Sequence, residues 1–133
     1  FWLRPPAWQP APVMEPNKAN PVEWGRYLSV AKFACFDCHS GNTMTNDYLH
    51  PENSWRFFKG GSPHVNKLGQ MVTSANLTPH GGSAVETWSE KDFARCLRTG
   101  IRPDGTVLQN PMFPFSQLTE DEAGAIFRFL QTL

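Results

Sequence analysis

Apolar residues recur every three or four positions in three stretches of the chain, residues 21–35, 90–99 and 120–133. This spacing places the apolar side chains of each stretch on one face of a helix. The apolar positions are Trp24, Tyr27, Leu28, Ala31, Ala34 and Cys35 in the first stretch, Phe93, Cys96 and Leu97 in the second, and Ala123, Ile126, Phe127, Leu130 and Leu133 in the third. The pattern therefore predicts three helices, each with one buried side.

The ends of these stretches carry residues that typically cap helices. A polar side chain before the first turn can accept a hydrogen bond from a free backbone N–H, and a glycine after the last turn can adopt a left-handed conformation. Two of the starts also have the spacing of a capping box. The capping residues are Asn20 with Pro21 at the first helix, Ser89 with Asp92 and Gly100 at the second, and Thr119 with Glu122 at the third.

Between the first and second predicted helices the pattern changes. Residues 40–87 are rich in Gly, Asn, Ser, Thr and Pro, and nothing in them reads as a strong strand. We expect one short helix there, around Glu52–Lys59. Loops of this length are uncommon inside a compact domain unless they serve a function. A large flat cofactor would explain the stretch, because it would fill the core in place of side chains.

The start of the chain is rich in proline, with six of its 12 prolines in the first 21 residues. Such a segment cannot form a regular helix or a central strand. We expect residues 1–20 to be an extended linker or surface wrap, and residues 21–133 to form one domain. The opening Phe1-Trp2-Leu3 suits two origins equally, an upstream membrane anchor or fused domain, or the cleavage of a signal peptide.

Composition narrows the class of protein. The 133 residues include 12 Lys and Arg and 12 Asp and Glu, so the formal net charge is zero. A neutral chain with 18% charged residues lacks the basic footprint of most nucleic-acid-binding domains. No apolar run approaches the ~18 residues that a transmembrane helix needs. Three cysteines are too few for a disulfide framework in a chain of this length.

Two of these cysteines form a Cys-x-x-Cys-His motif, Cys35-Phe36-Asp37-Cys38-His39. This motif is typical of c-type haem attachment. Two cysteines at this spacing, at the end of a helix, can each add to one vinyl group of the same porphyrin. The histidine that follows then lies beneath the iron as its proximal ligand. The motif therefore predicts one haem c, held covalently through Cys35 and Cys38.

Other interpretations of the motif fit less well. A thioredoxin-like redox pair should follow a strand in a βαβ unit, and no such strand is expected before Cys35. A structural zinc site needs four Cys or His ligands, usually as two spaced pairs, whereas Cys96 stands alone. A cysteine pair with no cofactor, either reduced or as a disulfide, is the remaining alternative.

The chain resembles the class I c-type cytochromes, and most of all the cytochrome domains and subunits of bacterial periplasmic alcohol and aldehyde dehydrogenases. The resemblance covers residues 21–133. It rests on Trp24–Leu28, Cys35–His39, Lys59–Gly61, Ser74–Pro79, Trp88–Phe93, Leu97–Gly105, Pro111–Met112 and the last helix. It implies an all-α, cytochrome c-like fold, in which about three main helices and long loops pack around one haem and the first and last helices cross.

The second axial ligand has to come from chain that has wrapped around the porphyrin. Met44 follows His39 too closely to reach the far face, and Met14 lies in the linker. Met112 is far along the chain, in a loop that Pro111 and Pro114 restrict. The family's ligand methionine also falls there, so we expect Met112 to bind the iron. The alternatives are Met71, a histidine, an open site, or a Met112 that only fills a gap in the core.

Several other residues have a possible role at the haem. We expect Trp88 to contact it. Asn76, Arg102, Arg98 and Tyr48 are candidates for hydrogen bonds to the propionates, although for each residue taken singly a solvated side chain is the better expectation. Cys96 is expected to be a buried, inert thiol. The remaining histidines, His50, His64 and His80, are expected in surface loops.

With His39 and Met112 as ligands, the iron would have no free position for a substrate. We therefore expect a one-electron carrier and not an enzyme, in the periplasm or on the outer face of the bacterial cytoplasmic membrane. Its partners would be a membrane-associated dehydrogenase or quinol-oxidising complex and a downstream acceptor. The alternatives are a freely diffusing shuttle, a small haem peroxidase with an open distal site, and an inert structural or sensory haem domain.

Overall fold

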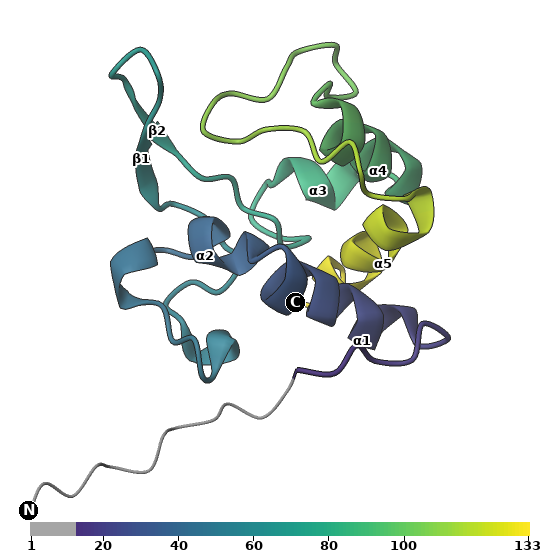
Figure 1. Cartoon of the computed structure of the whole chain (residues 1–133). Helices are drawn as coiled ribbons and strands as arrows, with labels where there is room; N and C mark the ends of the chain where they lie inside the picture. The colour runs from purple at the N-terminus through teal and green to yellow at the C-terminus, as the bar shows by residue number, and fades with distance from the viewer. Residues whose placement is uncertain (1–12) are drawn as a thin grey trace, which may run out of the picture.

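The computed structural model describes residues 13–133, and helices and loops dominate it (Figure 1). Two of the main helices, α4 and α5, lie next to each other, and α1 crosses α5. A small hairpin lies on the side away from α4 and α5, and the chain between these two helices forms a long loop that reaches toward it. The helices are α1 (Pro21–Arg26) with its π-helical continuation (Tyr27–Lys32), α2 (Cys35–His39), α3 (Ala84–Thr87), α4 (Glu90–Thr99) and α5 (Glu120–Leu130); the strands are β1 (Pro63–Val65) and β2 (Met71–Thr73), and 3-10 turns span Thr43–Thr45 and Pro51–Asn53.

Helices α4 and α5 confirm the second and third predictions. At the start of α4, the Ser89 hydroxyl accepts a hydrogen bond from the Asp92 N–H at 3.1 Å, and Asp92 accepts one from the Ser89 N–H at 3.4 Å. The same reciprocal bonds join Thr119 and Glu122 at 3.1 and 3.0 Å. Gly100 ends α4 with a φ of 78°, a left-handed conformation that glycine adopts without strain.

The prediction of one continuous helix over residues 21–35 is wrong. After Arg26 the helix widens, and the N–H of Phe33 bonds to the carbonyl of Leu28, five residues back, at 2.9 Å. The Ser29 hydroxyl bonds to the carbonyl of Gly25 at 2.8 Å, a contact that often bends helices. Ala34 then turns left-handed, with a φ of 49°, and α2 begins afresh. The Cys-x-x-Cys-His motif therefore occupies a short helix of its own.

The loop-rich middle of the chain holds more order than its sequence suggests. The two strands pair antiparallel, with His64 opposite Val72. Their turn is held by the Asn66 side chain, which accepts hydrogen bonds from the N–H groups of Leu68 and Gln70, both at 2.9 Å. The short helix expected at Glu52–Lys59 is replaced by the 3-10 turn Pro51–Asn53 and further turns, and helix α3 was not predicted.

The crossing of α1 and α5 depends on one glycine. A Cβ atom built on Gly25 would lie 1.9 Å from the carbonyl oxygen of Ala125, so only glycine lets the two backbones approach this closely. Around this contact the core is apolar, and Leu28, Ala123 and Leu130 are fully buried in it. The resemblance implies that the first and last helices cross, and in the structure they cross at this contact.

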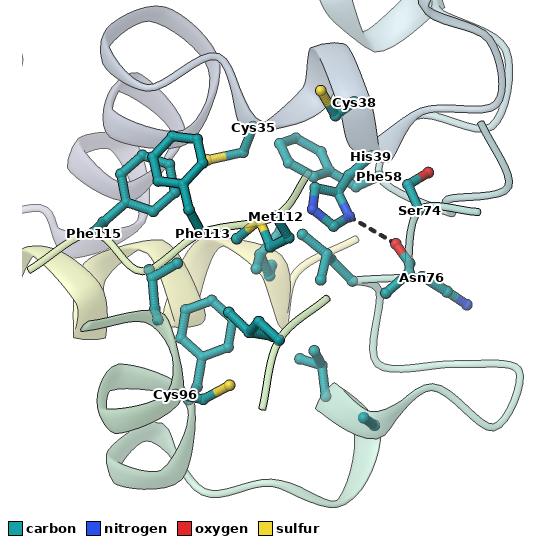
Figure 2. A pocket seen from close by; sticks show the side chains of 18 of the residues that line it. Cys35, Cys38, His39, Phe58, Ser74, Asn76, Cys96, Met112, Phe113 and Phe115 are labelled. Atoms are coloured by element: carbon teal, nitrogen blue, oxygen red, sulfur yellow. Dashed lines mark hydrogen bonds between the residues drawn. The ribbon is translucent and has the colours of Figure 1, made fainter. Parts of the chain in front are cut away.

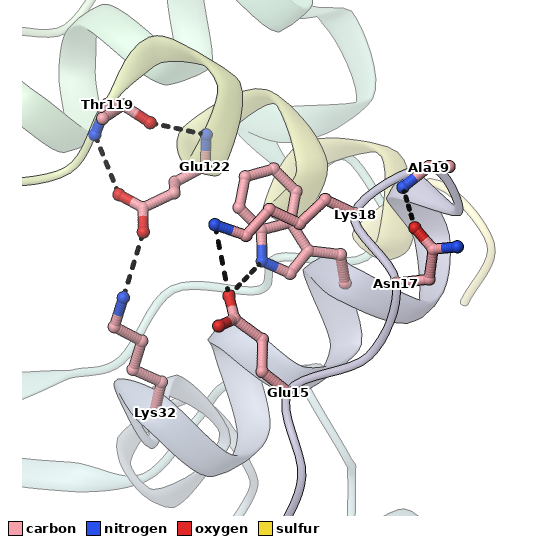
Figure 3. A network of polar contacts seen from close by, with 8 residues as sticks. Glu15, Asn17, Lys18, Ala19, Lys32, Thr119 and Glu122 are labelled. Atoms are coloured by element: carbon pink, nitrogen blue, oxygen red, sulfur yellow. Dashed lines mark hydrogen bonds and ion pairs between the residues drawn. The ribbon is translucent and has the colours of Figure 1, made fainter.

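The segment before α1 packs onto the domain. The Trp24 indole N–H donates to the Glu15 carboxylate at 3.0 Å, and the Lys18 ammonium lies 3.7 Å from the same carboxylate (Figure 3). The Lys18 ammonium also lies 5.2 Å from the centre of the Trp24 ring. Glu15 and Lys18 thus hold part of this segment against α1. Residues 1–12 of the expected linker lie outside the described part of the chain.

Across residues 13–133, the structure contains no helix with the length and apolar character to cross a membrane.

Candidate haem site

The structure contains a largely apolar cavity of about 350 Å³. Its walls come from α2, the hairpin and the loop that follows it, α3, α4, the loop at residues 108–115, and α5. Segments from most of the chain thus meet around one space. The separate α2 helix is what turns the Cys-x-x-Cys-His motif toward it.

Both cysteines of the motif border the cavity as free thiols. Cys35 is half-buried and Cys38 is exposed at the rim. Burial raises the pKa of the Cys35 thiol to about 12, and burial together with the Asp37 carboxylate also raises the pKa of Cys38. The attacking thiol of a redox pair has a lowered pKa, because the thiolate is the reactive form. The raised pKa values of these two thiols therefore do not favour a redox pair.

His39 is held in an orientation that suits a metal ligand. It is buried, and its Nδ1 lies 2.8 Å from the carbonyl oxygen of Ala75. A histidine whose Nδ1–H is held by a carbonyl presents a bare Nε2 to a metal. Figure 2 shows the ring pointing into the cavity. Burial lowers the pKa of His39, which keeps the imidazole in the neutral form that binds metals.

Met112 reaches the same cavity from the loop before α5 (Figure 2). Its backbone N–H bonds to the carbonyl of Gln109 at 3.0 Å, which fixes the loop locally. The neighbouring Asn110 side chain accepts a hydrogen bond from the backbone N–H of Lys67 at 2.9 Å and so ties the loop to the hairpin. The other three methionines, Met14, Met44 and Met71, are all exposed and border no part of the cavity.

The other predicted contacts fall into two groups. Trp88, Asn76 and Arg102 border the cavity, whereas Arg98 and Tyr48 do not. Tyr48 is 63% exposed, and its hydroxyl donates to Asp37 at 2.6 Å.

The polar groups of Asn76 and Arg102 have partners of their own. The Asn76 amide accepts from the N–H of Thr78 and donates to the carbonyl of His80, both at 2.9 Å. The Arg102 guanidinium donates through Nη1 to the carbonyl of Val107 and to the Thr106 hydroxyl. Both side chains are thus partly committed to holding their own turns.

Two further residues border the cavity. Cys96 is buried, as expected, and burial raises its pKa. His64 is a correction, because the expectation of a surface loop is wrong. It lies on β1 with its ring against the cavity, and its Nε2 is buried. The sequence gives no sign of this, because the order Pro63-His64-Val65 alternates apolar, polar and apolar and would place the histidine outward, whereas in the structure Pro63 and Val65 are the exposed residues.

The structure also bears on the competing interpretations of the motif. Within residues 13–133, no group of three or more His, Cys, Asp or Glu side chains is arranged to hold a metal ion by itself. A helix precedes Cys35, where a thioredoxin-like motif would follow a strand. The residues around the cavity do fit a haem, since they supply two thiols, one oriented imidazole, one thioether and an apolar lining.

No model of a known protein family matches the sequence. Two curated proteins are similar to it. The fructose dehydrogenase cytochrome subunit of Gluconobacter japonicus is 25% identical over 114 residues, which is 84% of this chain and 21% of that protein. The alcohol dehydrogenase (quinone) cytochrome c subunit of Gluconobacter oxydans is 29% identical over 111 residues, or 81% of this chain and 20% of that protein. The chain thus spans about a fifth of each relative's length. These relatives confirm the resemblance drawn from the motifs, and the chain is similar to cytochrome c subunits of bacterial dehydrogenases.

Proposed function

We propose that this chain is a mono-haem cytochrome c domain that carries single electrons and has no substrate of its own. The observation that carries the proposal is the meeting of Cys35, Cys38, His39 and Met112 at one apolar cavity. A bound haem c would supply the Fe(III)/Fe(II) couple. In this assignment the two cysteines would hold the porphyrin as thioethers, and His39 and Met112 would bind the iron.

The residues around the cavity would tune and protect the redox centre. The Ala75 carbonyl fixes the His39 ring, so the ligand does not reorient when the charge on the iron changes. The Met112 thioether favours the ferrous state relative to a second histidine. The apolar lining disfavours the extra charge of the ferric state and acts in the same direction. With both axial positions filled, peroxide and oxygen would find no free site on the iron.

We further propose that the domain serves as a cytochrome subunit of a membrane-associated dehydrogenase and passes electrons to a downstream acceptor on the periplasmic side. The names of the two relatives support this role over that of a free shuttle, because both are cytochrome subunits of dehydrogenases. The formal net charge of zero also favours a domain that stays bound to its partner, because a neutral domain gains little long-range electrostatic steering toward a partner in solution. The exposed Phe113, beside the Met112 loop, offers a small apolar contact at the cavity edge.

Expression with a haem c attachment system tests the assignment. The protein should retain haem after denaturation, and its pyridine haemochrome should be that of a haem with two thioether bonds. The ferric protein should show the weak red absorption band of iron bound to a thioether. Loss of the haem on denaturation would contradict covalent attachment.

Two matched methionine variants test the second ligand. Met112→Ala should abolish the red band, lower the midpoint potential, and open the iron to cyanide. Met71→Ala, which removes a methionine exposed to 66%, should change none of these. A red band that survives in Met112→Ala and disappears in Met71→Ala would reverse the assignment. Rapid reaction of the unmodified protein with peroxide would favour a peroxidase instead.

A further inference from the structure

Gly60 lies where two segments of the loop-rich side approach each other. Its backbone N–H donates to the carbonyl of His39 at 2.7 Å, so it holds the end of α2 from one side. A Cβ atom built on Gly60 would lie 2.5 Å from both the carbonyl carbon and the carbonyl oxygen of Ala75. The same Ala75 oxygen lies 2.8 Å from the Nδ1 of His39. Gly60 thus touches both the backbone of the histidine and the group that orients its ring.

A side chain at residue 60 would have no room. The backbone of Gly60 is left-handed, with a φ of 64°, and a Cβ there would meet backbone atoms of Ser74 and Ala75 and not a flexible side chain. These backbone atoms are tied in place, because hydrogen bonds join the two segments. They run from the Gly61 N–H to the Ser74 carbonyl and from the Ser74 N–H to the Ser62 carbonyl, both at 2.9 Å. A Cβ at residue 60 would therefore push the whole Ser74–Ala75 backbone away.

Such a displacement would act on His39. Ala75 is exposed, so a shift of its carbonyl away from the imidazole would let water replace it as the partner of Nδ1. A mobile water does not fix the orientation of the ring as a peptide carbonyl does. The hydrogen bond at Nδ1 also makes a ligating imidazole more basic, which favours the ferric state of an iron bound to it. The spacing between residue 60 and Ala75 thus bears on both the orientation and the basicity of the ligand.

We propose that Gly60 is a positioning residue for His39 as an axial ligand of the iron. The inference rests on the proposed function, since it needs a haem bound by His39. Because it has no side chain, Gly60 lets the Ala75 carbonyl come within hydrogen-bond reach of Nδ1, while its own N–H holds the His39 carbonyl. Together the two contacts fix the ring and keep the midpoint potential below the value that a more weakly bonded imidazole would give.

Gly60→Ala adds the Cβ, and two other variants separate the close approach from backbone strain. Gly69→Ala is the matched control, because Gly69 is also left-handed, with a φ of 75°, but a Cβ there would meet no atom within 4 Å. Gly60→Asn relieves strain, since asparagine tolerates the left-handed conformation, but it keeps the Cβ. Haem content by pyridine haemochrome is measured first in each protein. Absence of haem from the unmodified protein would overturn the proposed function, and this inference with it.

In haem-loaded ferrous protein, the Nδ1 proton of His39 should exchange with solvent about tenfold faster in Gly60→Ala, as expected for the loss of one hydrogen bond. The Fe(II)/Fe(III) ratio at a fixed potential should rise about threefold, which equals about 28 mV at 59 mV per tenfold for one electron. Gly60→Asn should behave like Gly60→Ala, and Gly69→Ala like the unmodified protein. Unchanged exchange and potential in Gly60→Ala would overturn this inference and leave the proposed function standing, as would recovery of both in Gly60→Asn or equal changes in Gly69→Ala.

The unmodified protein provides a test that does not depend on the folding of a variant. An α-proton of Gly60 and the Nδ1 proton of His39 both lie against the Ala75 carbonyl oxygen. In the diamagnetic ferrous form, with histidine labelled by nitrogen-15, these two protons should show a nuclear Overhauser contact. The absence of this contact, or an Nδ1 proton that exchanges as fast as that of free imidazole, would overturn the inference.

Discussion

The helical frame of the molecule and its loop-rich side are stabilised in different ways. The frame consists of α1, α4 and α5. Capping boxes stabilise the starts of α4 and α5, and the close approach at Gly25 packs α1 against α5. The loop side, residues 40–83, has one large side chain that is fully buried, Phe58. Much of its other apolar surface is exposed, as at Met44, Leu49 and Trp55. The frame thus carries its own apolar core, whereas the loop side buries little besides the side chains that border the cavity.

Removing the haem attachment should have the largest effect. We expect the double variant Cys35→Ala, Cys38→Ala to be mostly unfolded or degraded, because residues 40–87 would have little else to pack on. Circular dichroism, melting curves and limited proteolysis report this. Cys96→Ala is the control, since it removes a thiol outside the motif and should keep the haem. A haem-free double variant with native-like helicity and cooperative melting would contradict this prediction, because both sides of the molecule would then fold without the haem.

A substitution at the helix crossing should come next and should damage the frame itself. In Gly25→Ala the new Cβ would meet a carbonyl oxygen of the α5 backbone, which cannot move aside without shifting the helix. We expect the free energy of unfolding to fall by ~1–3 kcal/mol, the usual cost of overpacking. Denaturant unfolding of the haem-loaded protein measures it.

Gly124→Ala is the matched control for this prediction. Its Cβ would lie 2.6 Å from the Glu90 carboxylate oxygen, which is the far end of a flexible side chain. That side chain can move, and alanine is a better helix former than glycine by ~1 kcal/mol, so the stability should change little. Equal losses in the two variants would mean that the close backbone approach is not what limits residue 25.

Loss of a helix cap should have a smaller effect, confined to the frame. Thr119→Ala removes the hydroxyl that accepts from the Glu122 N–H, and caps of this kind contribute ~1 kcal/mol. We expect lower stability towards denaturant and an unchanged midpoint potential, because the cap residues Thr119 and Glu122 do not border the cavity. Thr45→Ala, in an exposed 3-10 turn, is the control. A change in the midpoint potential of Thr119→Ala would contradict this prediction and would mean that the stability of the frame affects the haem.

The acid dependence of the same cap should be the smallest effect. Burial alone would raise the pKa of Glu122, but hydrogen bonds from the Thr119 N–H and the Lys32 ammonium outweigh it and lower the pKa below its usual value. The contribution of Glu122 is therefore complete above its pKa in the unfolded chain and is lost as the pH falls through the lower, folded value. In Glu122→Gln this part of the acid destabilisation should disappear. A pH–stability curve identical to that of the unmodified protein would contradict the cap's ionic character.

The sequence predicted the frame better than the loops for a physical reason. The capping boxes at Ser89 and Thr119 are local signals, and α4 and α5 begin where those signals stand. The end of the first helix was missed because a π-helical turn and the left-handed Ala34 depend on packing and not on local preference. The three-residue strands leave too few positions for an alternation to be seen.

The candidate site follows the same division. The Cys-x-x-Cys-His motif is local, and so it could be identified from spacing alone. The position of Met112 at the cavity agrees with the argument from its restricted loop, although its ligand role stays a prediction. Which polar side chains border the cavity depends on which loop turns inward. The sequence therefore does not reveal that His64 borders the cavity or that Tyr48 lies away from it.

The hydrogen bond between the Lys67 backbone and the Asn110 side chain joins two loops that are far apart in the chain. In polymer terms it closes a ring, and the entropy cost of such a closure grows only slowly with the length of chain enclosed. The length of chain between Lys67 and Asn110 therefore adds little to the cost of this closure. Breaking the bond would remove a direct tie between the hairpin and the loop that carries Met112, and would loosen two walls of the cavity together.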